Sequence, residues 1–272
     1  GGRPVKWTPT RSEAFLTDSH GRDSELEGDL ALDAEGRFLA FRFRSTVNIG
    51  AYQTSFTTFT ATRNFFNSVA GVYRTPAIVA DITCVYSNTN PTAPYRGAGR
   101  PEANLILERL VDEAAGTLGV DRAELRRRNL VPAAAMPYRA ANGMEYCSGD
   151  FPAVLDRALA LADYDGFPAR RREAEARGRL RGLGLACYLE IAGVIPVEDL
   201  RLDVDAAGTV SIQSGLQSNG QGHETVFRRF VAERLGLGLD AVQLGIGDSA
   251  AVPNGVGSFA SRSITVGGAA AI

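Results

Sequence analysis

A short polar stretch, residues 217–225, carries residue types suited to holding a ligand, and its centre reads Gly220-Gln221-Gly222. It lies between a strand-like run and a helix-like run, so the glycines fall at a turn where backbone can pass close to a ligand. The N–H groups of the first helical turn can bind an anion, and the Gln221 amide can donate and accept hydrogen bonds at the edge of a heterocycle. An ordinary glycine-rich connection explains the same residues, so this motif alone leaves the function open.

A second candidate is the loop of residues 95–100, YRGAGR, hereafter the Arg96 loop. The next residue, Pro101, suits the first turn of a helix, where a backbone N–H has no partner within the helix. An arginine in a glycine-rich loop just before a helix is well placed to bind an anionic or carbonyl oxygen. The alternative is a structural ion pair between Arg96 and Glu102.

Two further features complete the candidate chemistry. Residues 253–263, hereafter the Ser261 loop, are rich in glycine and serine, which again let the backbone approach a ligand. Glu190 is a single acid in the apolar run 183–191. If Glu190 is buried, its pKa is raised and it can take part in chemistry; at the end of a strand it only contacts water.

The elements that must position these residues follow from hydrophobic periodicity and from turn and cap signals. We expect a turn at 33–36 and a boundary between two mixed domains, residues 1–178 and 179–272, which gives an α+β fold. The run Arg126-Arg127-Arg128 is interpreted as a solvated helix face. The expected strands are 26–32, 37–44, 75–85, 183–191, 200–204, 209–213 and 242–246, and the expected helices start at 101, 122, 151, 168 and 224.

Composition excludes several classes of protein. The 272 residues are 44% hydrophobic and 22% charged, with a formal net charge of -2, so neither nucleic acid nor an anionic membrane is an expected partner. No run reaches the ~20 apolar residues of a membrane helix. The cysteines are three and widely separated, which predicts neither a zinc site nor a disulfide framework and suits a reducing cytoplasm. Both ends look cut, so a fragment is expected.

The sequence does not predict a set of catalytic side chains. The two histidines, His20 and His223, lie in different halves of the chain, so neither a Ser–His–Asp set nor a metal cluster is predicted. Three loops of glycine or serine backbone with a few polar side chains describe a chain that holds a large polar cofactor and leaves the chemistry to it.

The order of these motifs resembles the molybdenum-binding large subunit of the xanthine dehydrogenase/aldehyde oxidase family. YRGAGR at 95–100, GQGHET at 220–225 and the Ser261 loop carry the resemblance, with GRPVKW at 2–7 and NIGAY at 48–52. The Arg96 loop resembles the second form of the carbon-monoxide-dehydrogenase-like large subunits. The CO-oxidising form has a cysteine after this arginine as a copper ligand, and here Gly97 and Ala98 follow. A thiolate is the natural ligand of Cu(I), so its absence argues against CO oxidation.

The resemblance implies roles for individual residues. Ala98 stands where purine oxidisers use a phenylalanine, and Asn64 falls at the place of their purine-orienting arginine, so the substrate is left open. Glu190 is assigned to the substrate pocket and is not the catalytic base by position. The residues implied to hold the cofactor are Arg96, Gly97, Asn219, Gly220, Gln221, Ala260, Ser261 and Ser263.

The activity implied by the family is hydroxylation of an aldehyde or N-heterocycle with oxygen from water. A glutamate in a G-x-G-E motif near the subunit's C-terminus acts as base, and no such motif occurs before Ile272, so the chain alone is expected to be inactive. The implied cofactor is molybdopterin with molybdenum, in its cytosine dinucleotide form. FAD and 2Fe–2S clusters belong to a medium and a small partner subunit, in a dimer of heterotrimers. The alternatives are a non-catalytic or degenerate cofactor-binding scaffold, or a true CO dehydrogenase.

Overall fold

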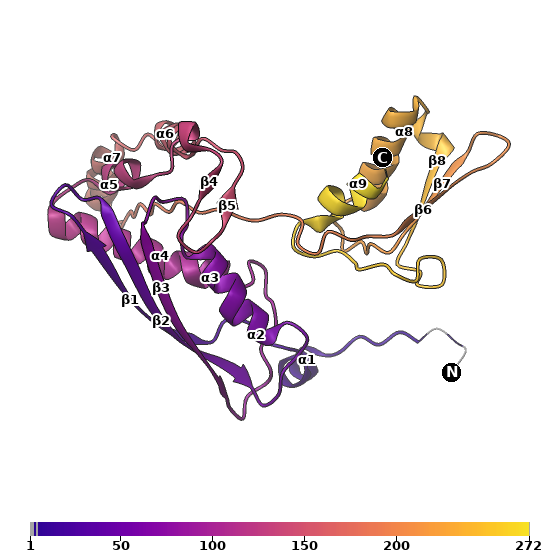
Figure 1. Cartoon of the computed structure of the whole chain (residues 1–272), viewed down its shortest axis with the longest axis horizontal. Helices are drawn as coiled ribbons and strands as arrows, with labels where there is room; N and C mark the ends of the chain where they lie inside the picture. Colours follow the sequence, from indigo (N-terminus) through magenta and orange to yellow (C-terminus); the bar gives the residue numbers. More distant parts are fainter. Residues whose placement is uncertain (1–2, 4, 272) are drawn as a thin grey trace. The chain divides into compact units, whose positions relative to one another are not determined.

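The computed structural model describes residue 3 and residues 5–271, so Gly2 and Pro4 of the opening motif lie outside the described residues. The chain forms two compact units, which divide between Leu189 and Glu190 (Figure 1). Both units combine helices with a mixed sheet, so the predicted α+β class is confirmed. The domain boundary at 178/179 stays a prediction. Across the described residues, no helix has the length and apolar character needed to cross a membrane.

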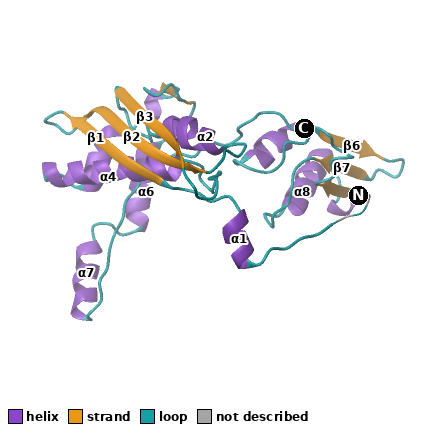
Figure 2. Ribbon diagram, turned by 90° about the horizontal axis from the view of Figure 1, so that it is seen from below, coloured by secondary structure: helices purple, strands orange, loops and turns teal. Residues whose placement is uncertain are grey.

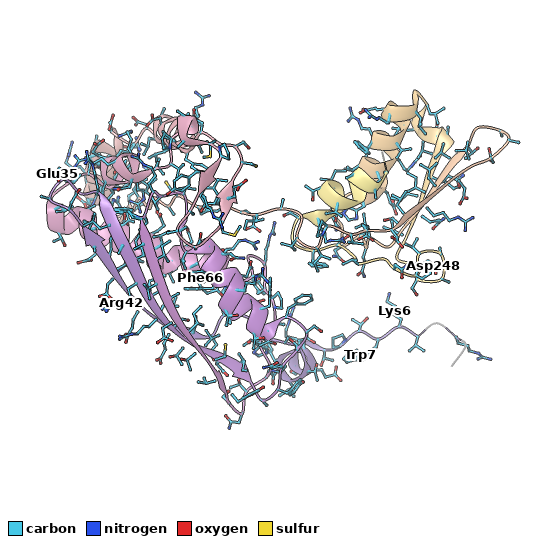
Figure 3. The ribbon with its side chains drawn as sticks, viewed as in Figure 1. Lys6, Trp7, Glu35, Arg42, Phe66 and Asp248 are labelled. Atoms are coloured by element: carbon cyan, nitrogen blue, oxygen red, sulfur yellow. The ribbon has the colours of Figure 1, made fainter. Side chains whose placement is uncertain are left out.

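The first unit is built on a three-stranded sheet with the order β1-β2-β3. Strands β1 (Ser24–Leu32) and β2 (Phe38–Gly50) form the predicted hairpin, and β3 (Ala77–Tyr86) lies parallel to β2. Alternation along β2 buries Phe41 and Phe43 and exposes Arg42, because successive side chains point to opposite faces. Arg42 projects from the outer face, where its Nε lies 2.8 Å from Asp29 Oδ2 (Figure 3).

Helices cover the inner face of this sheet (Figure 2). The long helix α4 (Arg100–Leu118) buries Leu107 and Val111 against the phenylalanines of β2. Local caps define several of the helix starts: the side chain of Asp121 accepts from the first turn of α5, and that of Asp150 from α6. The helices and short strands of this unit are α1 (Arg11–Thr17), α2 (Thr57–Phe59), the π-helix Thr60–Asn64, α3 (Phe65–Ser68), α5 (Arg122–Asn129), the 3-10 helix Ala133–Ala135, β4 (Tyr138–Arg139), β5 (Glu145–Tyr146), α6 (Phe151–Leu161) and α7 (Phe167–Ala176).

The prediction of a fully solvated arginine run on α5 is wrong for one residue. Arg126 is 0% exposed, and its Nη2 lies 2.8 Å from Glu108 Oε2 on α4. Arg127 and Arg128 do face solvent, where both pair with Glu124. Three consecutive helical residues span about 200° around the axis, so a helix packed on one side cannot expose all of them.

The predicted strand at 183–191 is also wrong, although its burial does alternate. Leu185, Cys187 and Leu189 pack on the core of the first unit. Among the described residues, no strand pairs with this segment, and side chains bond to some of its backbone groups. Arg126 Nη2 donates to Leu185 O at 3.1 Å, and Cys187 N donates to Glu108 Oε2 at 3.0 Å. An apolar alternating pattern therefore marks an extended segment here without a β-ladder.

The second unit has a sheet of order β6-β7-β8, in which β6 (Leu200–Val204) and β7 (Val210–Ser214) form the predicted hairpin. β8 (Val242–Ile246) runs parallel to β7. Helix α8 (His223–Leu235) connects β7 to β8 and packs Val231 and Ala232 against Ile212. The remaining elements are the 3-10 helix Leu239–Ala241, the π-helix Ser263–Gly267 and α9 (Gly268–Ala270).

Candidate cofactor-binding site

The Arg96 loop of the first unit has an unusual backbone. Gly97, Ala98 and Gly99 have φ values of 101°, 47° and 90°, so three consecutive residues are left-handed. Two hydrogen bonds close the turns: Ala98 N donates to Tyr95 O at 2.6 Å, and Arg100 N to Gly97 O at 3.1 Å. The left-handed region costs an L-residue about 1–2 kcal/mol. Contacts from the rest of the unit must therefore hold Ala98 in this shape.

Part of that support comes from the π-helix Thr60–Asn64. A Cβ on Gly99 would lie 2.4 Å from Thr60 O, so only glycine fits there. Asn64 is 5% exposed, and its Nδ2 donates to Ala98 O. The structure thus brings together the two residues predicted for the substrate pocket in this unit, and the Asn64 donor is engaged by the loop backbone. Single-turn π-helices are frequent at functional sites.

Arg22 provides the rest of the support, and the sequence pattern did not single it out. Its guanidinium lies over the Tyr95 ring at 4.6 Å and donates to Arg96 O. Its Nε also lies 3.6 Å from Glu102 Oε1. Within the described residues Glu102 thus pairs with Arg22 and not with Arg96, so the predicted alternative role for Arg96 is wrong; the Arg96 side chain is exposed.

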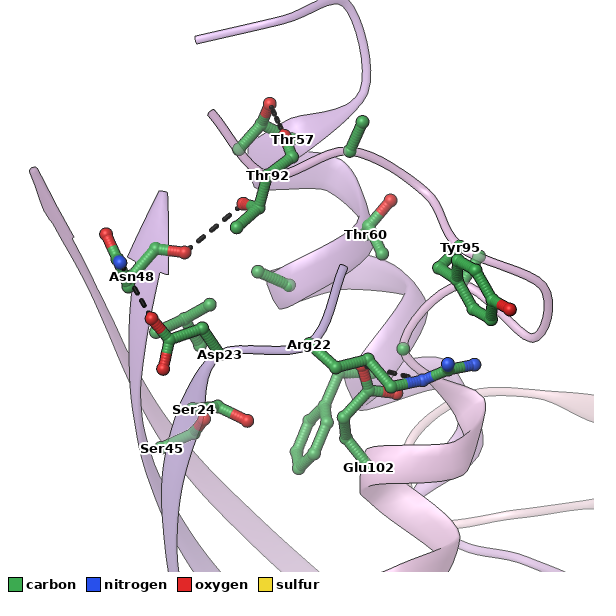
Figure 4. Close-up of a pocket in the computed structure, with 16 residues that line it drawn as sticks. Arg22, Asp23, Ser24, Ser45, Asn48, Thr57, Thr60, Thr92, Tyr95 and Glu102 are labelled. Carbon is green, nitrogen blue, oxygen red and sulfur yellow. Dashed lines mark hydrogen bonds and ion pairs between the residues drawn. The ribbon is translucent and has the colours of Figure 1, made fainter. Parts of the chain in front are cut away.

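A small cavity of about 30 Å³ lies beside this loop, with room for roughly one water molecule (Figure 4). Its lining includes Ala98 and the hydroxyl-bearing Thr57, Thr60 and Thr92. Asn48 ties one wall together, since its Nδ2 donates to Asp23 Oδ2 at 2.7 Å and its carbonyl accepts from Thr92 Oγ1 at 3.2 Å. Hydroxyls and carboxylates in this wall suit a small ligand group that donates hydrogen bonds.

In the second unit, residues 217–222 form the turn before α8 and are hereafter called the Gln221 loop. Hydrogen bonds within this loop stabilise its shape. Gln221 Oε1 accepts from Asn219 N, and Gln221 Nε2 donates to Gln217 O at 3.2 Å. Gly220 and Gly222 have φ values of 95° and 79°, and a Cβ on either would meet nothing within 4 Å. Glycine is therefore favoured at both positions by the positive φ and not by steric crowding. Among the described residues no side chain caps α8, so the first N–H groups of this helix have no partner within the helix.

The Ser261 loop meets this turn in the second unit. Gln217 N donates to Ser258 Oγ at 3.0 Å, and a Cβ on Gly215 would lie 2.1 Å from Gly255 Cα. The predicted residues Ala260 and Ser261 are left-handed, with φ values of 47° and 55°, and Ser263 opens a π-helix. Gly193 N donates to Ala260 O at 3.2 Å. The segment that begins with the exposed Glu190 thus reaches this loop.

Arg262 holds the Ser261 loop from inside. Its side chain and that of Glu198 are both 0% exposed, and its Nη1 pairs with Glu198 Oε2 and donates to Gly257 O at 2.6 Å. Its Nη2 donates to the carbonyls of Ile195 and Val197. One buried guanidinium therefore joins the loop backbone at Gly257 to the segment 195–197.

The donor set of these loops fits a large polar ligand better than a metal ion. Among the described residues, no group of three or more His, Cys, Asp or Glu side chains could hold a metal. What the loops offer instead is backbone N–H, amide and hydroxyl groups on left-handed turns that precede helices, which suit phosphate and heterocycle edges. The fold and the site thus define a cofactor-holding chain of two α+β units.

Comparison with known proteins identifies the family. Models of the molybdopterin cofactor-binding domain match residues 1–130 and residues 157–272. The chain belongs to the family of molybdenum-binding large subunits of xanthine dehydrogenase type, as the sequence resemblance predicts.

Individual relatives agree with this family. The chain is 34% identical to the 6-hydroxypseudooxynicotine dehydrogenase complex subunit gamma of Paenarthrobacter nicotinovorans, over 99% of this chain and 34% of the relative. It is 32% identical to the carbon monoxide dehydrogenase large chain of Hydrogenophaga pseudoflava, over 99% of this chain and 36% of the relative. The structure of quinoline 2-oxidoreductase from Pseudomonas putida 86 superposes on this chain with a TM-score of 0.88 and 31% identity. The superposition covers 99% of this chain and 36% of that structure's chain. The chain therefore spans about a third of these relatives.

Proposed function

We propose that this chain holds the molybdopterin cofactor in a molybdenum hydroxylase that oxidises an aldehyde or an N-heterocycle with oxygen from water. The observation that carries the proposal is the set of left-handed, glycine-containing turns in both units, within the residues that match molybdopterin-binding domains. The bound cofactor supplies the redox centre that the described side chains lack. We assign no catalytic residue to the chain itself.

The residues proposed to hold the cofactor divide between the units. In the first unit, Arg96 presents an exposed side chain, and Gly97 presents left-handed backbone that packs against Pro101. In the second unit, the Gln221 loop offers Asn219, Gly220 and Gln221, and the Ser261 loop offers Ala260, Ser261 and Ser263. Their role is to bind and orient: backbone N–H groups donate to anionic oxygens, and hydrogen bonds inside each loop fix those donors before the ligand arrives.

In the first unit, the residues proposed for the substrate pocket are Asn64 and Ala98. Ala98 is small and the Asn64 donor is bound to Ala98 O, so neither side chain offers a purine the aromatic face or the charge that purine oxidisers use. This supports aldehydes or simpler N-heterocycles as substrates. The relative named for quinoline oxidation supports the same class.

Copper-dependent CO oxidation is the second candidate, because one relative is a carbon monoxide dehydrogenase large chain. Cu(I) needs a soft thiolate ligand, and the Arg96 loop contains no cysteine. Burial raises the pKa of Cys187 to about 11, so that residue stays a protonated thiol at neutral pH. Both facts favour the hydroxylase.

We further propose the partners that such an enzyme needs: a 2Fe–2S small subunit and an FAD medium subunit, in a cytoplasmic dimer of heterotrimers. The relative named as a complex subunit supports an assembly of several chains. The cytosine dinucleotide form of the cofactor is part of the same proposal.

The test is metal analysis by mass spectrometry and fluorescent pterin release on the protein purified, with the chains that accompany it, from a host that makes the cofactor. Near-stoichiometric molybdenum with little copper supports the hydroxylase and directs a screen of aldehydes and N-heterocycles. Equal copper would favour CO oxidation. Neither molybdenum nor pterin would leave a scaffold without catalysis.

A further inference from the structure

The cavity beside the Arg96 loop is lined by polar groups whose hydrogen bonding the fold leaves incomplete. Ser45, on the inner face of β2, is 4% exposed and lines this cavity (Figure 4). Across the described residues, the Ser45 hydroxyl makes no hydrogen bond. Glu102 lines the same cavity, and within the described residues its Oε2 is buried without a hydrogen-bond partner. Buried polar groups without partners are unfavourable in a folded protein, so a bound species is expected to satisfy these oxygens.

The charged residues that line the cavity carry more negative than positive charge. Among the described lining residues there are two carboxylates, Asp23 and Glu102, and one guanidinium, Arg22, which leaves one negative charge unbalanced. Arg22 compensates Glu102 only in part, because its Nε lies 3.6 Å from Oε1 and its guanidinium also donates to the Arg96 loop. Asp23 Oδ2 accepts from the neutral amide of Asn48 at 2.7 Å, which adds no positive charge. The cavity therefore favours a cation.

The atoms available to a cation are oxygens, which are the ligands that hard cations prefer. Ser24 also lines the cavity, and the β1–β2 register pairs it with Val47, so Ser45 is its diagonal neighbour on the same face. Among the described residues of the lining there is neither cysteine nor histidine, which argues against a soft metal. The single unbalanced charge favours a monovalent cation, and a cavity of about 30 Å³ suits an ion about the size of a water molecule, such as potassium.

We propose that this cavity binds one monovalent cation of the potassium class, held by side-chain oxygens of Ser24, Ser45 and Glu102. The ion balances the lining charge and replaces the missing partners of the buried oxygens. Ala98 and Gly99 line the same cavity, so binding is expected to stabilise the left-handed turn of the Arg96 loop. The site does not depend on the proposed function, because it uses no contact with a cofactor.

Hydrogen exchange of peptides covering residues 95–100 measures whether a cation stabilises the loop. The protein, purified with the chains that accompany it, is compared in KCl and in choline chloride, each at about 0.1 M so that ionic strength is constant. Choline is too large for a cavity of about 30 Å³ and serves as the control cation. Wild type should exchange about fivefold more slowly in KCl, as expected when the potassium concentration is about four times the Kd.

Two substitutions locate the binding site. Ser45→Ala removes the hydroxyl, and Glu102→Gln removes the negative charge while keeping the shape of the side chain. Each should reduce the difference between KCl and choline chloride to less than about twofold. Because Glu102→Gln also weakens the pair with Arg22, the two salts are compared within each variant. Thr46→Ala, at the next residue of β2 on the exposed face, is the matched control and should keep the full response.

A crystal soaked in RbCl should show an anomalous scattering peak of rubidium, a substitute for potassium, inside the cavity. Three results would overturn the inference. Equal exchange of wild type in KCl and choline chloride would mean that the cavity holds water alone. A full potassium response in both Ser45→Ala and Glu102→Gln would place the ion elsewhere. A larger effect of CaCl2 than of KCl at equal ionic strength would refute the argument from a single unbalanced charge.

Discussion

The Arg96 loop and the Ser261 loop each hold an alanine in the left-handed region, at Ala98 and at Ala260. Each also depends on an arginine that donates to loop carbonyls, and the two arginines differ in burial. The Arg22 side chain is 33% exposed and rests on a tyrosine ring, whereas the Arg262 side chain is 0% exposed and faces a buried glutamate.

This difference determines how firmly each loop is held. A buried charge has no water to replace a lost partner, so removing one member of the Arg262–Glu198 pair leaves the other uncompensated. At Arg22, water can replace much of what is lost, and salt screens the pair with Glu102. The Ser261 loop is therefore expected to be the more rigid, and the Arg96 loop the more adjustable.

The largest effect is expected from Arg262→Ala. It should lower the free energy of unfolding of the second unit by about 3–5 kcal/mol, because Glu198 is left buried without its cation. Hydrogen exchange on peptides covering 253–263 should rise at the same time. The matched control is Arg229→Ala, which removes the exposed pair with Glu233 on α8 and should cost less than about 0.5 kcal/mol. Equal costs for the two variants would contradict the role of burial.

An intermediate effect is expected from Asn64→Ala in the first unit. The substitution removes the Asn64 Nδ2 donor and leaves Ala98 O without it, which should cost about 1–2 kcal/mol of unfolding free energy. Denaturant unfolding measures this cost, and exchange at residues 95–100 reports the loop. Ser68→Ala is the control, since its hydroxyl only bonds back to Asn64 O in the same helical segment. Unchanged exchange at 95–100 would show that Asn64 does not hold the loop.

The elements that the sequence predicts well are those with local signals. The turn at 33–36 forms because Asp33 Oδ1 accepts from Glu35 N and Arg37 N, within four residues. Asp121 and Asp150 cap their helices in the same local way. In these cases residue type and spacing specify the conformation without help from distant parts of the chain.

Long-range partners account for the failures. Arg126 is buried because Glu108 meets it from another helix. Among the described residues no strand pairs with the segment at 183–191, and side chains of α4 and α5 bond to some of its backbone groups. The residue pattern around Arg126 or within 183–191 does not indicate that these distant side chains lie beside it.

The same limit applies to the candidate site. Motifs locate the three loops, yet the contacts that shape them join residues 74 positions apart for Arg22 and Arg96, and 64 apart for Glu198 and Arg262. A left-handed alanine such as Ala98 also carries no sequence signal, because alanine is common in every other conformation. The assignments of Asn64, Glu190 and the loop residues to pocket and cofactor remain predictions.

The smallest effect is expected from Arg22→Ala, and salt should distinguish it from Arg262→Ala. It removes the stacking on Tyr95, the donor to Arg96 O and the pair with Glu102, yet partial exposure limits the cost to about 1 kcal/mol of unfolding free energy. Because the Debye length falls from ~10 Å at 0.1 M to ~3 Å at 1 M salt, the difference from wild type should shrink on adding NaCl. Denaturant unfolding at both concentrations measures it. A cost as large and as salt-independent as that of Arg262→Ala would mean that both loops are held equally firmly.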